Sequence, residues 1–212
     1  MVTQPAPARA HDSGFAWLVG RRWFWALVIG TLFSLPLVRA LLRPPPKFPP
    51  VRGLAPIFTL TRENGKAFGS HDLVNKVWVV SRFTDDDSML SMRTMHELER
   101  HMRKLADEFE LVSVVVDPAV DSTARLADWA KVHKTNPRRW ALLDGPLPEL
   151  RRVRGALDLD PSRVSADPLV LVDRRGRIRG IYDITGDPTT DKNAKATLQQ
   201  IMFDAALLVN GY

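Results

Sequence analysis

Residues 77–116 read VWVVSRFTDDDSMLSMRTMHELERHMRKLADEFELVSVVV, and this stretch decides the predicted fold. Its first seven residues, 77–83, are mostly β-branched or aromatic, which is typical of a central strand buried on both faces. In residues 88–109, apolar side chains recur at three- and four-residue steps and predict a helix with one apolar face. Residues 111–116 form a second apolar run. Strand, helix and strand in this order predict two parallel strands joined by a helical crossover.

The flanking sequence supplies the other elements of an α/β domain. A strand pattern at 57–60 precedes the hairpin-turn sequence Glu63-Asn64-Gly65-Lys66. Further strands are predicted at 169–172 and 178–182, and further helices at 123–133, 147–153 and 192–209. This order predicts a thioredoxin-like α/β fold, in which helices flank a central mixed sheet.

The N-terminal part of the chain predicts attachment to a membrane. Residues 23–38 carry no charge, and the apolar character resumes at 40–42. About 20 apolar residues cross a bilayer core, so residues 23–42 are predicted to form one transmembrane helix. A cleaved signal peptide is the alternative, but Arg39 and Arg43 stand where its small-residue cleavage site would lie. The predicted organisation is a tail at 1–22, the anchor at 23–42, a proline-rich linker at 43–54 and a domain at 55–212.

The composition limits the chemistry that the chain can perform. It has 212 residues, a formal net charge of +6 and no cysteine. Without cysteine, disulfide exchange, thiolate nucleophiles and cysteine-bound metals are excluded. The positive charge favours anionic lipid or an acidic partner, whereas no recognition helix or zinc-finger spacing points to nucleic acid.

Four segments, in the right order, resemble the Sco/SenC family. They are PIFTLT at 56–61, VSVVVDPAVDST at 112–123, WALLDG at 140–145 and LVDRRGRIRGIY at 171–182. The resemblance covers about residues 55–208 and implies a thioredoxin-fold protein tied to copper delivery for cytochrome c oxidase. It also implies a single-pass protein of the cytoplasmic (inner) membrane, with its globular domain on the outer, periplasmic side. The implied partner is a respiratory oxidase subunit or another assembly factor.

The resemblance also identifies what this chain lacks. The family's metal site consists of a C-x-x-x-C pair at a strand-to-helix turn and one histidine before the closing hairpin. By the resemblance, these ligands fall at Asp86, at Leu90 and near Ser165. Leucine cannot bind a metal, and a single carboxylate is a poor ligand for Cu(I). The expected result is a degenerate copper site, with no catalytic, cofactor-binding or metal-binding residue and no cofactor.

The altered turn and the helix after it each allow two interpretations. Asp85, Asp86 and Asp87 at a helix N-terminus predict a stable cap, because carboxylates accept free backbone N–H groups there; an acidic patch or cation site is the alternative. Methionine and histidine bind Cu(I), so Met89, Met92 and His96 could form a relocated copper site. Methionine at helical spacing also fills cores, which is the competing interpretation.

The other polar residues suggest no reaction. His133 at a helix end, and Asp117 and Asp121 in a strand-to-helix connection, are predicted to cap helices and shape turns. No serine, histidine and acid stand in a context that suggests a triad. Arginines concentrate in the C-terminal half and predict a solvated face, with an anionic lipid or acidic partner as the alternative: Arg151, Arg152, Arg154, Arg163, Arg174, Arg175, Arg177 and Arg179.

The predicted function is therefore that of a Sco/SenC-like accessory or assembly factor of a respiratory cytochrome oxidase. It would be anchored in the membrane, would not be an enzyme, and would act by protein–protein contact rather than by redox or copper transfer. A copper(I) carrier using Met89, Met92 and His96 is the alternative function. A thiol-independent enzyme is a third hypothesis, for which the sequence offers no constellation of residues.

Overall fold

The computed structural model describes residues 21–42, 47–83, 88–105, 107–116, 122–159 and 167–211. The chain divides into two compact units, Met1–Pro46 and Lys47–Tyr212. In the first unit, helix α2 (Arg22–Leu41) covers most of the predicted anchor and contains Pro36. Within the described ranges, however, no helix combines the length and apolar character that a membrane span requires.

The second unit is built on one mixed sheet of eight strands, in the order β1-β8-β7-β4-β5-β6-β2-β3. Strands β4, β5 and β6 are parallel, and every other neighbouring pair is antiparallel. The strands are β1 (Gly53–Leu54), β2 (Thr59–Arg62), β3 (Ala67–Gly69), β4 (Val77–Phe83), β5 (Phe109–Val115), β6 (Trp140–Asp144), β7 (Asp167–Val172) and β8 (Arg177–Ile184).

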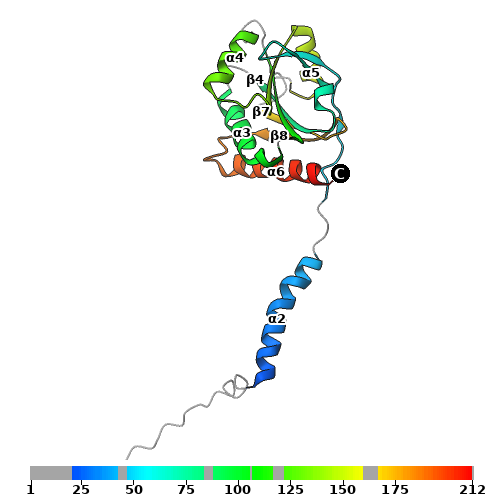
Figure 1. Ribbon diagram of the computed structural model, residues 1–212, viewed down its shortest axis with the longest axis vertical. Coiled ribbons are helices and arrows are strands. Elements are labelled where there is room, and N and C mark those ends of the chain that lie inside the picture. Colours follow the sequence, from blue (N-terminus) through cyan, green and yellow to red (C-terminus); the bar gives the residue numbers. More distant parts are fainter. Residues whose placement is uncertain are drawn as a thin grey trace, which may run out of the picture. The chain divides into compact units, whose positions relative to one another are not determined.

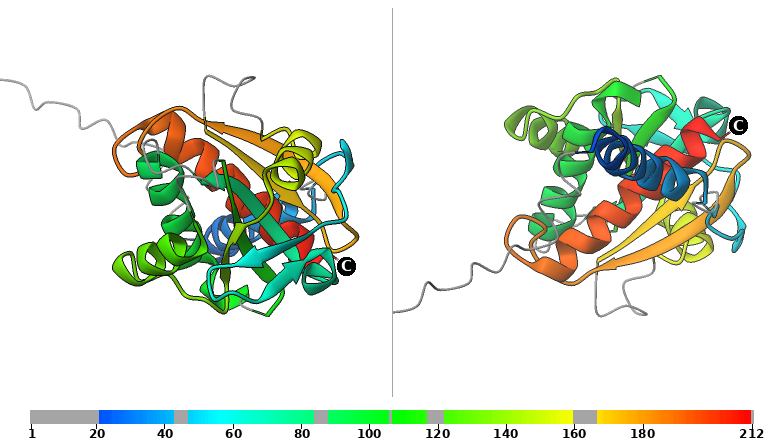
Figure 2. Two further views of the ribbon diagram at one scale, coloured as in Figure 1. Left: turned by 90° about the horizontal axis from the view of Figure 1, so that it is seen from above. Right: turned by 90° about the horizontal axis from the view of Figure 1, so that it is seen from below.

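Helices cover both faces of this sheet (Figures 1 and 2). Side chains of β4 alternate between two hydrophobic cores: Val77 and Val79 face one, and Trp78 and Val80 face the other. The first core is completed by α3, α4 and α6, and the second by α5 and a turn of 3₁₀ helix. The helical elements are η1 (Ser70–Leu73), α3 (Ser88–His101), η2 (Met102–Leu105), α4 (Thr123–Val132), α5 (Leu147–Ala156) and α6 (Lys192–Asn210).

The thioredoxin-like fold predicted from the sequence is confirmed, with several corrections to its elements. The strand predicted at 57–60 lies at Thr59–Arg62, and β1 was not predicted. The helix predicted to run to Phe109 ends at His101, and η2 follows it. Phe109 instead opens β5, where it pairs with Val77 of β4. Strand β6 was not predicted, although all of its residues except Asp144 are buried. Tertiary pairing in the sheet overrides local periodicity at Phe109 and in β6.

A buried chain of hydrogen bonds links the three parallel strands. The Trp140 indole Nε1 donates to the Ser113 hydroxyl at 3.0 Å, and that hydroxyl lies 2.7 Å from the hydroxyl of Ser81. All three side chains are buried. Because buried polar groups require partners, these contacts fix the register of β4, β5 and β6.

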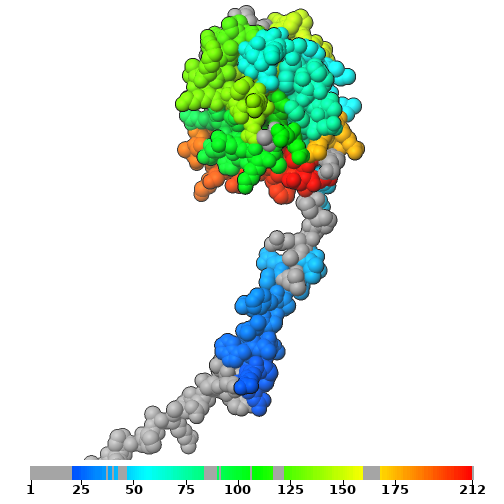
Figure 3. All heavy atoms as spheres, viewed as in Figure 1, coloured from blue at the N-terminus to red at the C-terminus, as the bar shows by residue number. Residues whose placement is uncertain are grey.

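The start and the end of the second unit lie side by side (Figures 1 and 3). Phe48 packs so closely on Gly211 that a side chain at Gly211 would overlap its ring. Farther along, the Arg52 N–H donates to the Ile178 carbonyl at 2.8 Å, and the Ala55 N–H donates to the Gly176 carbonyl at 2.8 Å. The segment 47–52, called here the tether, is therefore fastened to the edge of the sheet beside β8.

Candidate functional site

The predicted ligand positions lie around the turn between β4 and α3. Residues 84–87 are outside the described ranges, so the aspartate cap, including Asp86, stays a prediction. Ser165, Asp117 and Asp121 also lie outside those ranges. Leu90, in the first turn of α3, is half-buried and offers only hydrocarbon. At this described position, the side chain does not fit a copper ion, because it carries no donor atom.

The proposed relocated copper site separates into residues with different surroundings. Met92 is 5% exposed and belongs to the first hydrophobic core together with Met95 and Leu98. The side chain of Met89 lies outside the described part of the structure. His96, one turn after Met92, is half-buried. The packing of Met92 favours the structural role that methionine commonly has in cores.

His96 belongs to an aromatic cluster between α3 and α4, which the sequence did not suggest. Its ring meets the Trp140 ring edge-on, with centroids 5.1 Å apart, and its centroid is 6.4 Å from that of His133. His133 stacks on Trp129 at 4.0 Å with an interplanar angle of 14°. Trp129 in turn meets Phe83 edge-on at 5.2 Å. The two histidines thus pack mainly as rings, and His133 is also the C-cap of α4, as predicted.

The electrostatic environment of His96 agrees with this packing role. Burial lowers the pKa of His96 below its ordinary value, and the nearby His133 lowers it further. Glu99 and Glu97 act in the opposite direction without reversing the shift in pKa. Among the described residues, no group of three or more histidine, aspartate or glutamate side chains could hold a metal ion.

The arginines of the C-terminal half do not form the single solvated face that was predicted. Arg154 and Arg179 are buried, and Arg154 donates to the Val116 carbonyl at 2.6 Å. Arg177 and Arg179 both pair with the fully buried carboxylate of Asp173, at 2.8 and 3.1 Å. The expectation is therefore wrong for these residues, because Arg154 joins α5 to the end of β5 and the other two shape the β7–β8 hairpin. Arg163 lies outside the described ranges.

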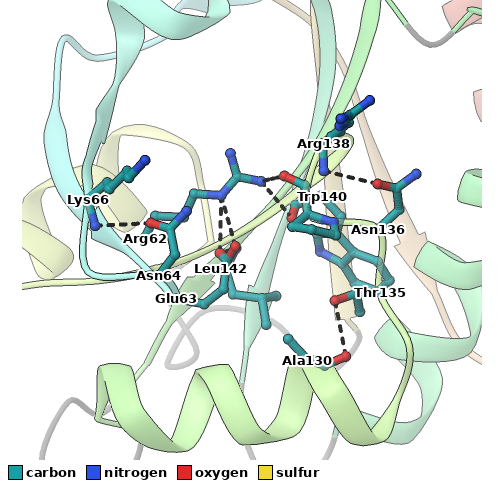
Figure 4. Close-up of polar contacts among 11 residues, drawn as sticks. Arg62, Glu63, Asn64, Lys66, Ala130, Thr135, Asn136, Arg138, Trp140 and Leu142 are labelled. Carbon is teal, nitrogen blue, oxygen red and sulfur yellow. Dashed lines mark hydrogen bonds and ion pairs between the residues drawn. The ribbon is translucent and has the colours of Figure 1, made fainter.

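A second polar network holds the β2–β3 hairpin against β6 (Figure 4). The Glu63 carboxylate accepts a hydrogen bond from the Leu142 N–H at 3.1 Å, and the Arg62 Nε lies 3.0 Å from the same carboxylate. The Arg62 guanidinium also donates to the carbonyls of Pro137 and Trp140. These bonds, together with the hydrogen bond from the Glu63 N–H to the Leu142 carbonyl, join the end of β2 to β6, so the network is structural.

A groove of about 430 Å3 lies in the second unit and is lined by residues that follow the tether. Trp78 and Leu73 lie at its base, and the exposed side chains of Leu54, Ile57 and Val74 lie along it. Its lining includes Arg174 and Arg175 but no carboxylate. Sequence reasoning missed this groove, because its residues come from separate parts of the chain with no shared local pattern.

The fold and the candidate site define a class of protein: a thioredoxin-like domain, lacking thiols, that follows a separate apolar helix. Within that class, residues 51–202 match the family model described as SCO1/SenC. The chain therefore belongs to the SCO1/SenC family. None of the curated proteins matches it in sequence.

Solved structures with the same fold include several Sco proteins. The SCO1/SenC family lipoprotein from Bacillus anthracis is 23% identical, with a TM-score of 0.59 over 75% of this chain and 99% of that chain. The Arabidopsis thaliana ScoI structure with copper bound is 14% identical, with a TM-score of 0.58 over 75% of this chain and 99% of that chain. The Bradyrhizobium japonicum ScoI structure with copper bound is 23% identical, with a TM-score of 0.51 over 70% and 99%. At these identities the likeness establishes the fold.

Proposed function

We propose that this SCO1/SenC protein is a non-redox accessory or assembly factor of a respiratory cytochrome oxidase, acting by surface contact. One solved structure of the same fold, BsSco, is described as a member of the Sco family of cytochrome c oxidase assembly proteins. The observation that carries the proposal is the retention of the family's domain over residues 51–202 in a chain with no cysteine.

The chemistry of the remaining side chains supports contact rather than transfer. Thiol exchange requires a thiolate, and no residue of this chain can supply one. Soft sulfur ligands select Cu(I), yet the described methionine of the candidate site, Met92, is packed in the core. What the domain retains is a rigid, well-packed scaffold, which can present a surface to a partner without reacting.

The proposal includes a membrane anchor at 23–42, with the domain on the periplasmic side. Support comes from the absence of charge between Trp23 and Val38 and from the exposed apolar side chains of α2. Water is a poor solvent for such a surface, and a bilayer is a suitable one. The exposed side chains include Trp23, Trp25, Leu27, Ile29, Leu32, Phe33, Leu35 and Leu41.

The test is co-purification from native membranes. The full chain, tagged at its C-terminus, is cross-linked in cells, extracted in mild detergent and analysed by mass spectrometry. Residues 1–46 alone, fused to an unrelated soluble domain, serve as the control. We expect oxidase subunits or assembly factors with the full chain and not with the control. Their absence from the full-chain sample, or equal recovery with the control, would contradict the proposal.

A further inference from the structure

Four of the seven exposed large apolar side chains in the described part of the second unit come from residues 48–57. Ile57 is 85% exposed, Leu54 73%, Val74 61% and Val51 50%. Three of them, Leu54, Ile57 and Val74, line the groove described above, called here the tether groove. Soluble domains rarely expose contiguous apolar surface of this kind, so we expect this surface to be covered by another molecule.

The charged side chains in the lining of the tether groove are both cationic. They are Arg174 and Arg175, and Lys47 and Arg52 belong to the tether that precedes the groove in the sequence. Arg174 is also held in place, because its guanidinium pairs with Glu108 and donates to the Val209 carbonyl at 2.8 Å. Apolar side chains rimmed by cations match the interfacial region of a bilayer that contains anionic lipid.

The length of chain before the groove limits how far it can lie from a membrane. Helix α2 ends at Leu41, and the tether is fastened to β8 at Arg52. Eleven chain steps lead from Leu41 to Arg52. At about 3.1 Å per residue for a proline-rich extended chain, they span roughly 34 Å. An anchored α2 would therefore keep the start of the groove within about this distance of the headgroups.

We propose that the tether groove is a membrane-docking surface, in which Leu54, Ile57 and Val74 enter the lipid interface and Arg175 faces anionic headgroups. This inference rests on the proposed anchor at 23–42. Docking would hold the domain in one orientation on the bilayer and direct α4, which packs on the other face of the sheet, away from the lipid.

The absence of cysteine makes the proposal directly testable, because each single-cysteine variant carries one spin label. The full chain is reconstituted in nanodiscs of equimolar phosphatidylcholine and phosphatidylglycerol. Labels are placed by Ile57→Cys in the groove, by Leu32→Cys in α2 and by Val132→Cys as the matched control. Val132 is 74% exposed and ends α4, which packs on the first core, whereas Trp78 and Leu73 of the groove belong to the second core. The collision rate of each spin label with oxygen reports its contact with lipid, and the collision rate with a water-soluble nickel complex reports its contact with water.

We expect the label at Ile57 to collide with the nickel complex several-fold less often than the label at Val132, and more often with oxygen. Equal nickel access at Ile57 and Val132, with Leu32 shielded, would overturn the docking surface and leave the anchor standing. Nickel access at Leu32 as well would overturn both. The Ile57 label could instead be shielded from nickel only in discs that hold two copies, with dipolar broadening of its spectrum. That result would assign the groove to a second copy of the chain and overturn the lipid assignment. Shielding that requires an added oxidase complex would assign it to a protein partner and would also overturn the proposal.

Discussion

Met92 distinguishes the structural account of α3 from the copper-carrier account, because the two predict opposite effects of the same substitutions. Met92 is 5% exposed and is packed among the side chains of the first core. Truncating a buried methionine to alanine costs about 2–5 kcal/mol, through lost burial and the cavity left behind. Replacing it with leucine, which has a similar volume, costs less than about 1.5 kcal/mol.

We therefore expect Met92→Ala to lower the free energy of unfolding by about 3 kcal/mol, and Met92→Leu to change it little. For a domain of this size, about 2–4 °C per kcal/mol converts that loss into a fall in Tm of roughly 6–12 °C. Urea unfolding followed by circular dichroism measures both variants. Met202→Ala, at a half-buried position on α6, is the control and should cost less.

The copper-carrier account predicts a different pattern. If the Met92 thioether were a metal ligand, Met92→Leu would keep the stability of the metal-free protein and weaken Cu(I) binding at least about tenfold, a loss of about 1.4 kcal/mol. That result, together with a small effect of Met92→Ala on unfolding, would refute the assignment of Met92 to the core.

Three further predictions follow from buried polar groups. Burial lowers the pKa of His96, so the stability that neutral His96 contributes is present above the ordinary histidine pKa and is lost as pH falls below that value. His96→Gln should therefore reduce the loss of unfolding free energy on acidification. An unchanged dependence of unfolding free energy on pH would contradict this prediction. Ser113→Ala should lower the free energy of unfolding in urea by about 2–4 kcal/mol, because the Ser81 hydroxyl and the Trp140 indole N–H both lose their buried partner. A loss below about 1 kcal/mol would show that these two groups find another partner. Burial raises the pKa of Tyr182, and so does the hydrogen bond that its hydroxyl donates to Asp204. The stability that the protonated Tyr182 hydroxyl contributes is therefore lost only as pH rises above the ordinary tyrosine pKa. Phenolate absorbance of the native protein and of Tyr182→Phe should coincide at about pH 11, and a difference before unfolding would contradict the buried hydrogen bond.

The fold was predictable from the sequence where local pattern and tertiary packing agree. The β-branched run at 77–83 became β4, with the predicted bounds, because its side chains fill a core on both faces of the sheet. Phe109 was misassigned because its spacing continues the helical period, while its place in the structure is set by pairing with Val77. Strand β6 was missed because periodicity alone does not distinguish a continuous apolar run such as 140–143 from a helical segment, and this run, unlike 77–83, has no β-branched residue.

For the candidate site, the sequence alone shows only which types of ligand the chain lacks. The absence of cysteine is read from the sequence, and the resemblance indicates that Leu90 stands where the family has a cysteine ligand. The packing of His96 against Trp140, and the burial of Arg154, depend on contacts between distant parts of the chain. The tether groove joins Leu54 and Ile57 to Arg174, more than a hundred residues later, so no local pattern could reveal it.

The central claim, that the family's copper site is vacated and not relocated, is tested most directly by a Cu(I) titration of the full chain in detergent against a chelator of known affinity. The positive control combines Asp86→Cys, Leu90→Cys and Ser165→His, which places the family's ligand types where the resemblance puts them. We predict that the native chain shows no binding tighter than about 1 µM, whereas the control binds more tightly. Stoichiometric, tight binding by the native chain, lost on combining Met89→Leu, Met92→Leu and His96→Gln, would contradict the claim and establish a copper carrier.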